Sequence, residues 1–171
     1  LREDITYLNN GAYGACPRPV FEKYQWWQRQ VEDQPVELLF RRLPGLMTQA
    51  RAELAAYVGA NPLDVVFVPN VTTGINVVAR SLKLMPGDEI LTTDHEYGGI
   101  ERVWHFICRR SGAIYRPQAI PVPVSTAEDF VERMWSGVTD RTRVLFLSHI
   151  TASTALILPL TELCRRARER G

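Results

Sequence analysis

The chain has 171 residues, of which 46% are apolar and 23% are charged, a composition typical of a folded globular protein and unlike that of disordered chains. Twenty Lys and Arg against nineteen Asp and Glu leave a formal net charge of +1, so there is no electrostatic reason to expect a nucleic acid or an anionic membrane as a partner. No run approaches the roughly 18 apolar residues of a membrane span, the cytoplasm is the default location, and three scattered cysteines predict neither disulfides nor a metal site.

The first 61 residues predict an N-terminal helical segment. Apolar residues recur every three or four positions in two stretches, Val20, Tyr24, Trp27 and Val31, then Leu46, Ala50, Leu54 and Tyr57. Prolines suit the opening of the first helix, and Gly59 suits the end of the second. The proline-bounded stretch 34–45 between them predicts a short connection.

Residues 62–171 predict alternating strands and helices. The strand candidates are Val65–Val68, Glu89–Thr93, Ala113–Ile120 and Arg143–Ser148, with amphipathic helical patterns between and after them. Strands that are nearly continuously apolar and are separated by helices indicate an α/β fold, with a largely parallel sheet and helices on both faces. Ligands of such sheets bind at the carboxyl ends of the strands, so the residues at those ends are the candidates for binding and catalysis.

The first strand end carries N-V-T-T-G-I-N, residues 70–76. We expect Thr72 to cap a helix that begins near Thr73, where free backbone N–H groups, hydroxyls and the helix dipole together favour a phosphate. Capping alone is the competing interpretation. The spacing is neither that of a P-loop nor that of a dinucleotide fingerprint.

Two further strand ends carry rings and hydroxyls. T-T-D-H-E-Y-G-G, residues 92–99, offers His95 and Tyr97 as planar rings, with a solvated loop as the alternative. L-S-H-I-T-A-S-T-A, residues 147–155, offers His149 and several hydroxyls. Three polar clusters at three strand ends exceed what helix capping requires.

With these clusters, the chain resembles the N-terminal part of a fold type I pyridoxal-phosphate enzyme of the class V aminotransferase family, in its isopenicillin N epimerase-like branch. The resemblance is carried by Y-L-N-N-G-A-Y-G from Tyr7, F-V-P-N-V-T-T-G-I-N from Phe67, P-G-D-E-I-L-T-T-D-H-E-Y-G from Pro86 and S-H-I-T-A-S-T-A-L-I-L-P from Ser148. These motifs span nearly the whole chain in order. The resemblance implies pyridoxal 5'-phosphate as the cofactor and an amino acid as the substrate.

The resemblance also implies roles for individual residues. Val71, Thr72 and Thr73 would hold the cofactor phosphate, and His95 would stack on the pyridine ring, with Tyr97 as its rival. Ser148 and His149 would lie near the phenolic oxygen, with Ser153 and Thr154 as neighbouring candidates. Asn10 and Gly11 would lie on the substrate side of the pocket. One departure is Ala155, which stands where relatives commonly have glycine.

The resemblance places the Schiff-base lysine and the carboxylate for the pyridine nitrogen beyond Gly171. Lys23 and Lys83 are the only lysines, and neither matches the family's lysine motif. We therefore expect residues 62–171 to be an incomplete cofactor-binding domain, the chain to be a piece of a longer enzyme, and these 171 residues alone to be inactive. The alternative is a non-catalytic α/β module that binds a phosphorylated small molecule. The resemblance further implies a homodimer, in which Phe40–Pro44 either reaches the partner's site or is an ordinary connection.

Overall fold

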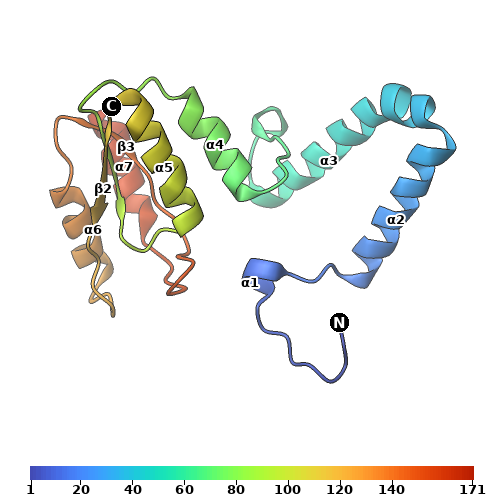
Figure 1. Cartoon of the computed structure of the whole chain (residues 1–171), viewed down its shortest axis with the longest axis horizontal. Coiled ribbons are helices and arrows are strands. Elements are labelled where there is room, and N and C mark those ends of the chain that lie inside the picture. Colours follow the sequence, from blue (N-terminus) through green and yellow to red (C-terminus); the bar gives the residue numbers. More distant parts are fainter. The chain divides into compact units, whose positions relative to one another are not determined.

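A computed structural model describes all residues from 1 to 171, which divide into two compact units, Leu1–Phe67 and Val68–Gly171. Figure 1 shows the two units along the chain, from the blue N-terminus to the red C-terminus. We call them the helical unit and the sheet unit and describe each by itself. No helix is long and apolar enough to cross a membrane.

The helical unit contains the two predicted helices. Its elements are α1 (Asn10–Tyr13), α2 (Arg18–Asp33), the π-helix η1 (Glu37–Arg42), α3 (Leu43–Val58) and the 3-10 turn η2 (Pro62–Asp64). Gly59 ends α3 in the left-handed conformation, with φ of 70°, as expected for a helix C-terminus. The predicted connection at 34–45 is wrong in part, because η1 runs directly into α3 and Pro44 is tolerated in the first turn of α3.

The sheet unit confirms the α/β prediction. Its elements are α4 (Val71–Ser81), β1 (Glu89–Thr93), α5 (Gly98–Ser111), β2 (Ile114–Gln118), α6 (Ala127–Ser136), β3 (Thr142–Leu145) and α7 (Leu160–Arg170). The strands form a parallel sheet in the order β2-β1-β3, with Ile90 opposite Tyr115 on one side and Val144 on the other. β1 is therefore the central strand, and its carboxyl end lies between two neighbours.

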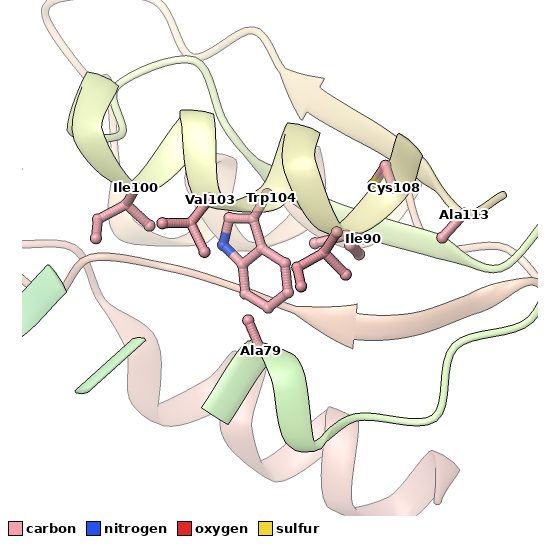
Figure 2. Close-up of a cluster of buried hydrophobic side chains, with 8 residues drawn as sticks. Ala79, Ile90, Ile100, Val103, Trp104, Cys108 and Ala113 are labelled. Carbon is pink, nitrogen blue, oxygen red and sulfur yellow. The ribbon is translucent and has the colours of Figure 1, made fainter. Parts of the chain in front are cut away.

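Helices cover both faces of the sheet. Alternate residues of β1 point to opposite sides, so Ile90 joins a core with α4 and α5, while Leu91 joins a core with α6 and α7. In the first core the indole of Trp104 points from α5 toward Ala79 on α4 (Figure 2). The second core is built around Phe130, Met134 and Leu163.

The predicted strand at Val65–Val68 is wrong. These residues belong to no strand, and Val66, Phe67 and Val68 are exposed. A β-strand requires a neighbour that accepts and donates its backbone hydrogen bonds, and no other segment of the 171 residues supplies one. The apolar pattern identified an apolar segment without identifying a pairing partner.

At the amino end of β1, the Glu89 carboxylate joins the three strands. It accepts hydrogen bonds from Arg116 on β2 at 2.6 Å, from Thr142 on β3 at 3.5 Å and from Thr139 just before β3 at 2.6 Å. The Thr139 hydroxyl, followed by Arg116, holds the pKa of Glu89 below its ordinary value. On the same strand, directly before Arg116, burial raises the pKa of Tyr115 to about 12, and the negative charge of Glu101 adds to the effect.

Candidate functional site

The N-terminus of α4 is capped by Asn70 rather than by the predicted Thr72. The Asn70 side-chain oxygen accepts the Thr73 N–H at 2.8 Å and the Thr73 hydroxyl at 3.1 Å, and its backbone oxygen accepts the Gly74 N–H. Asparagine ranks above threonine as a cap, and here it lies three residues before the N–H that it binds. The helix therefore starts at Val71, two residues earlier than a Thr72 cap would allow.

This cap leaves donors free in the first turn of α4. The N–H groups of Val71 and Thr72 have no partner within the helix, because they precede its first repeating hydrogen bond. The half-buried Thr72 hydroxyl is also uncommitted, whereas the Thr73 hydroxyl is already bound to Asn70. Two backbone donors, one hydroxyl and the positive end of the helix dipole can together bind an anion.

The start of α4 lies at the same end of the sheet unit as the carboxyl end of β1. Figure 1 shows α4 and α5 side by side, both beginning at that end. The residues that link β1 to α5 are Asp94, His95, Glu96 and Tyr97. The packing of α4 beside α5 thus brings the predicted anion site and the predicted ring residues to one end of the unit.

Asp94 and His95 bind the chain just beyond β2. Asp94 accepts the backbone N–H of Ile120 at 2.9 Å, and His95 Nε2 lies 2.7 Å from the backbone oxygen of the same residue. Only 11% of the His95 side chain is exposed. The imidazole therefore has a fixed place between the ends of β1 and β2.

Glu96 binds the chain just beyond β3. Its carboxylate accepts the backbone N–H of Ser148 at 3.0 Å and the hydroxyl of Ser148 at 2.6 Å, and it lies 3.2 Å from the Thr93 hydroxyl. The Ser148 hydroxyl is consequently committed to Glu96. The resemblance implies that Ser148 lies near the cofactor's phenolic oxygen. It gives no role to Glu96, although a carboxylate three residues past a strand is a visible signal.

The segment 149–158, which we call the threonine hairpin, packs against His95. An antiparallel bridge joins Ile150 to Ile157, and Thr154 Oγ1 lies 3.2 Å from His95 Nδ1. Thr154 in turn contacts the buried Thr151 at 2.7 Å. Thr151 is a further residue that the sequence analysis missed, because nothing in the local pattern identifies it.

The hairpin turns at Ala155, the one non-glycine residue with positive φ, at 52°. Its backbone N–H donates to the Thr151 oxygen at 3.0 Å, which closes the turn. A Cβ atom disfavours this left-handed conformation. The departure noted in the sequence, alanine in place of glycine, therefore coincides with a strained turn.

The remaining predicted residues lie in more open positions. His149 and Ser153 are exposed on the threonine hairpin, and only the backbone oxygen of His149 is bound, by the Leu158 N–H at 2.8 Å. Tyr97 is 56% exposed, and its ring lies so close over Gly99 that an added Cβ would stand 2.5 Å from Cε1. Asn10 and Gly11 open α1 in the helical unit and are exposed.

Neither lysine belongs to this cluster of residues. Lys23 lies on α2 in the helical unit, with Nζ 3.8 Å from the centre of the Trp26 ring. Lys83 is exposed just beyond the C-terminal end of α4, opposite to the end that carries the free donors.

Comparisons with known proteins place the chain in a family. Residues 6–171 match the family model described as Aminotransferase class-V. The chain is 41% identical over 98% of its length to an isopenicillin N epimerase from Amycolatopsis lactamdurans, of which it covers 42%. The chain thus spans about two fifths of the length of this relative.

Solved structures share the fold. The cystine C–S lyase C-DES, in complex with its reaction product cysteine persulfide, aligns with a TM-score of 0.83 and 28% identity over 97% of this chain and 44% of its own. A variant of C-DES with glycine covalently linked to its pyridoxal-phosphate cofactor aligns with a TM-score of 0.80 and 27% identity, over 98% of this chain and 44% of its own.

Proposed function

Because this chain belongs to the class V aminotransferase family, we propose that it supplies part of the cofactor site of a pyridoxal 5'-phosphate-dependent enzyme that acts on an amino acid. The relatives' names support an epimerase or a carbon–sulfur lyase, and the family's name supports an aminotransferase. Within this proposal, residues 1–61 are the helical segment with the substrate loop, and residues 62–171 are an incomplete cofactor-binding domain.

The observation that carries the proposal is the set of uncommitted donors at the start of α4. The Val71 and Thr72 N–H groups and the Thr72 hydroxyl fit a phosphate monoester, whose oxygens accept hydrogen bonds and whose charge the helix dipole favours. Thr73 would contribute its hydroxyl by exchanging its bond to Asn70 for one to the phosphate. When bound, the cofactor supplies an electron sink for reactions at the α-carbon of an amino acid.

His95 is the residue that we assign to stacking on the cofactor ring. Both of its nitrogens are engaged at the ring edge, so the plane of the imidazole is fixed and its flat face is the part left for stacking. Tyr97 is the weaker candidate, because its ring is exposed and lies on the backbone at Gly99. The role of His95 is to orient the cofactor ring.

Further roles rest on the resemblance. We propose that His149 and Ser153 on the threonine hairpin face the cofactor and that Asn10 and Gly11 face the substrate. We also propose a homodimer, with Phe40–Pro44 directed at the partner's site. Glu96 holds Ser148, and thereby the start of the hairpin, at the end of β1.

Binding of pyridoxamine 5'-phosphate to the chain tests the phosphate site. This ligand lacks the aldehyde of the cofactor and cannot react with lysine. We expect Thr72→Val to weaken binding by about tenfold or more, the effect of losing one hydrogen bond to a charged acceptor, as measured by isothermal titration calorimetry. Thr161→Val, at an exposed threonine on α7, is the matched control and should bind like the wild type.

Two results would contradict the proposal. If Thr72→Val and the wild type bind pyridoxamine 5'-phosphate with equal affinity, the N-terminus of α4 does not belong to the binding site. Equal wild-type affinity for pyridoxamine 5'-phosphate and for inorganic phosphate would show that the ring is not recognised, and it would favour a non-catalytic module for phosphorylated small molecules.

A further inference from the structure

The hydrogen bonds of His95 determine which ring nitrogen carries the proton. Nε2 lies 2.7 Å from the Ile120 backbone oxygen, and a carbonyl oxygen can only accept. Nε2 is therefore the donor. In the neutral ring, Nδ1 is then the acceptor, and the hydroxyl of Thr154 at 3.2 Å donates to it.

The directions of the neighbouring hydrogen bonds follow. The Thr154 hydroxyl donates its hydrogen bond to His95, so in the contact of 2.7 Å between Thr151 and Thr154 the donor is Thr151. Thr151 Oγ1 in turn accepts the Leu156 N–H at 2.9 Å. One continuous series runs from the Leu156 amide through two hydroxyls and the imidazole to the Ile120 carbonyl, and such bonds reinforce one another.

The turn at Ala155 holds Thr154 in place. The N–H of Ala155 is tied to the Thr151 oxygen, and the Leu156 N–H to the Thr151 hydroxyl, so both residues that follow Thr154 are fixed to Thr151. The left-handed conformation of Ala155 is retained although a Cβ disfavours it. The surrounding hydrogen bonds thus over-determine where the Thr154 hydroxyl lies.

We propose that Thr154, supported by Thr151, is a positioning residue that fixes the tautomer and the plane of His95 for stacking on the cofactor ring. The inference rests on the proposed function, in which the His95 face meets that ring. Without the donor at Nδ1, the imidazole keeps a single tether at Nε2 and can rotate about it. Thr154 acts through His95 and makes no contact with the cofactor in this scheme.

Nitrogen-15 NMR of His95 tests the inference in the absence of ligand. At about pH 8.5, the wild type should show a protonated Nε2 and a hydrogen-bonded Nδ1. Thr154→Val, which preserves side-chain shape, should move the Nδ1 resonance toward that of an unbonded nitrogen. Thr154→Ser, which keeps the hydroxyl, should restore the wild-type position.

Ligand titration supplies the second readout. Thr154→Val should weaken binding of pyridoxamine 5'-phosphate by about fivefold and leave the affinity for inorganic phosphate within about twofold, because only the ring contact depends on His95. Thr154→Ser should again match the wild type, and Thr161→Val is the control for an exposed threonine.

The outcomes separate this inference from the proposed function. An unchanged Nδ1 resonance in Thr154→Val overturns the positioning role, whatever the ligand affinities are. If Thr154→Val weakens the binding of pyridoxamine 5'-phosphate and of inorganic phosphate equally, Thr154 has a general structural role, and the positioning role is again overturned. If the wild type binds neither ligand, the proposed function fails, and the NMR change alone decides whether Thr154 orients the ring.

Discussion

At the scale of single residues, Asn70 serves the fold and the candidate site together. It satisfies the third N–H of α4, so that the helix can begin at Val71, and it leaves the first two N–H groups free. A cap at Thr72 would have consumed the hydroxyl that is uncommitted in the structure. The choice of capping residue therefore determines which donors remain for an anion.

Two substitutions of Asn70 should separate these roles. Asn70→Ala should lower the free energy of unfolding by about 1 kcal/mol, the usual effect of losing a cap, as measured by urea denaturation. Asn70→Asp keeps an acceptor and should retain the stability, but its negative charge should weaken binding of pyridoxamine 5'-phosphate several-fold. Comparable destabilisation by both substitutions would contradict the capping role.

At the scale of elements, the sequence pattern predicts local helices and strands, but it does not predict strand pairing or hydrogen bonds between residues far apart in the sequence. The apolar runs that became β1, β2 and β3 were recognised because each run is itself the signal. The run at Val65–Val68 carries the same signal, but strand formation also depends on a neighbour that local pattern cannot reveal. The bond between His95 and Thr154 joins residues 59 positions apart, and no spacing rule predicts it.

The strand-joining carboxylate of Glu89 gives the sheet an acid sensitivity. The pKa of Glu89 is lowered in the folded chain. Its ionised carboxylate therefore stabilises the fold at pH values above its ordinary pKa of 4.5, and this contribution is lost as the pH falls through the pKa of the folded state. Glu89→Gln should therefore lower the free energy of unfolding at pH 7 by about 1.5 kcal/mol and flatten its decline in acid. Urea denaturation between pH 7 and pH 3 measures both effects.

Glu22→Gln, at an exposed position on α2, is the control for the loss of one carboxylate. It should leave the acid dependence as steep as in the wild type. An equally steep decline in Glu89→Gln would mean that other carboxylates govern the acid sensitivity of the sheet.

At the scale of the whole molecule, the 171 residues combine the proposed phosphate site at the start of α4 with lysines unsuited to a covalent bond to the cofactor. A Schiff-base lysine works from a desolvated pocket beside the cofactor. Lys83 is exposed at the far end of α4, and Lys23 lies on a Trp ring in the other unit. The expectation that neither Lys23 nor Lys83 is the Schiff-base lysine comes from the resemblance. Composition and periodicity alone predict only an α/β domain.

We expect no lysine of this chain to react stoichiometrically with pyridoxal 5'-phosphate, and no turnover of amino acids by these residues alone. Borohydride reduction followed by mass spectrometry measures the adduct at equimolar cofactor. Substoichiometric labelling scattered over Lys23 and Lys83 is the expected pattern. Complete labelling of either residue would overturn the expectation and identify that lysine as the cofactor's partner.

The unpaired segment Val65–Val68 has a consequence for the chain in concentrated solution. Its backbone is in no strand, three of its apolar side chains are exposed, and none of its four residues is charged. Such a segment can pair with the same segment of another molecule and begin aggregation, although Pro69 interrupts the pairing at one end. The chain's solubility thus depends on whether these four residues are covered.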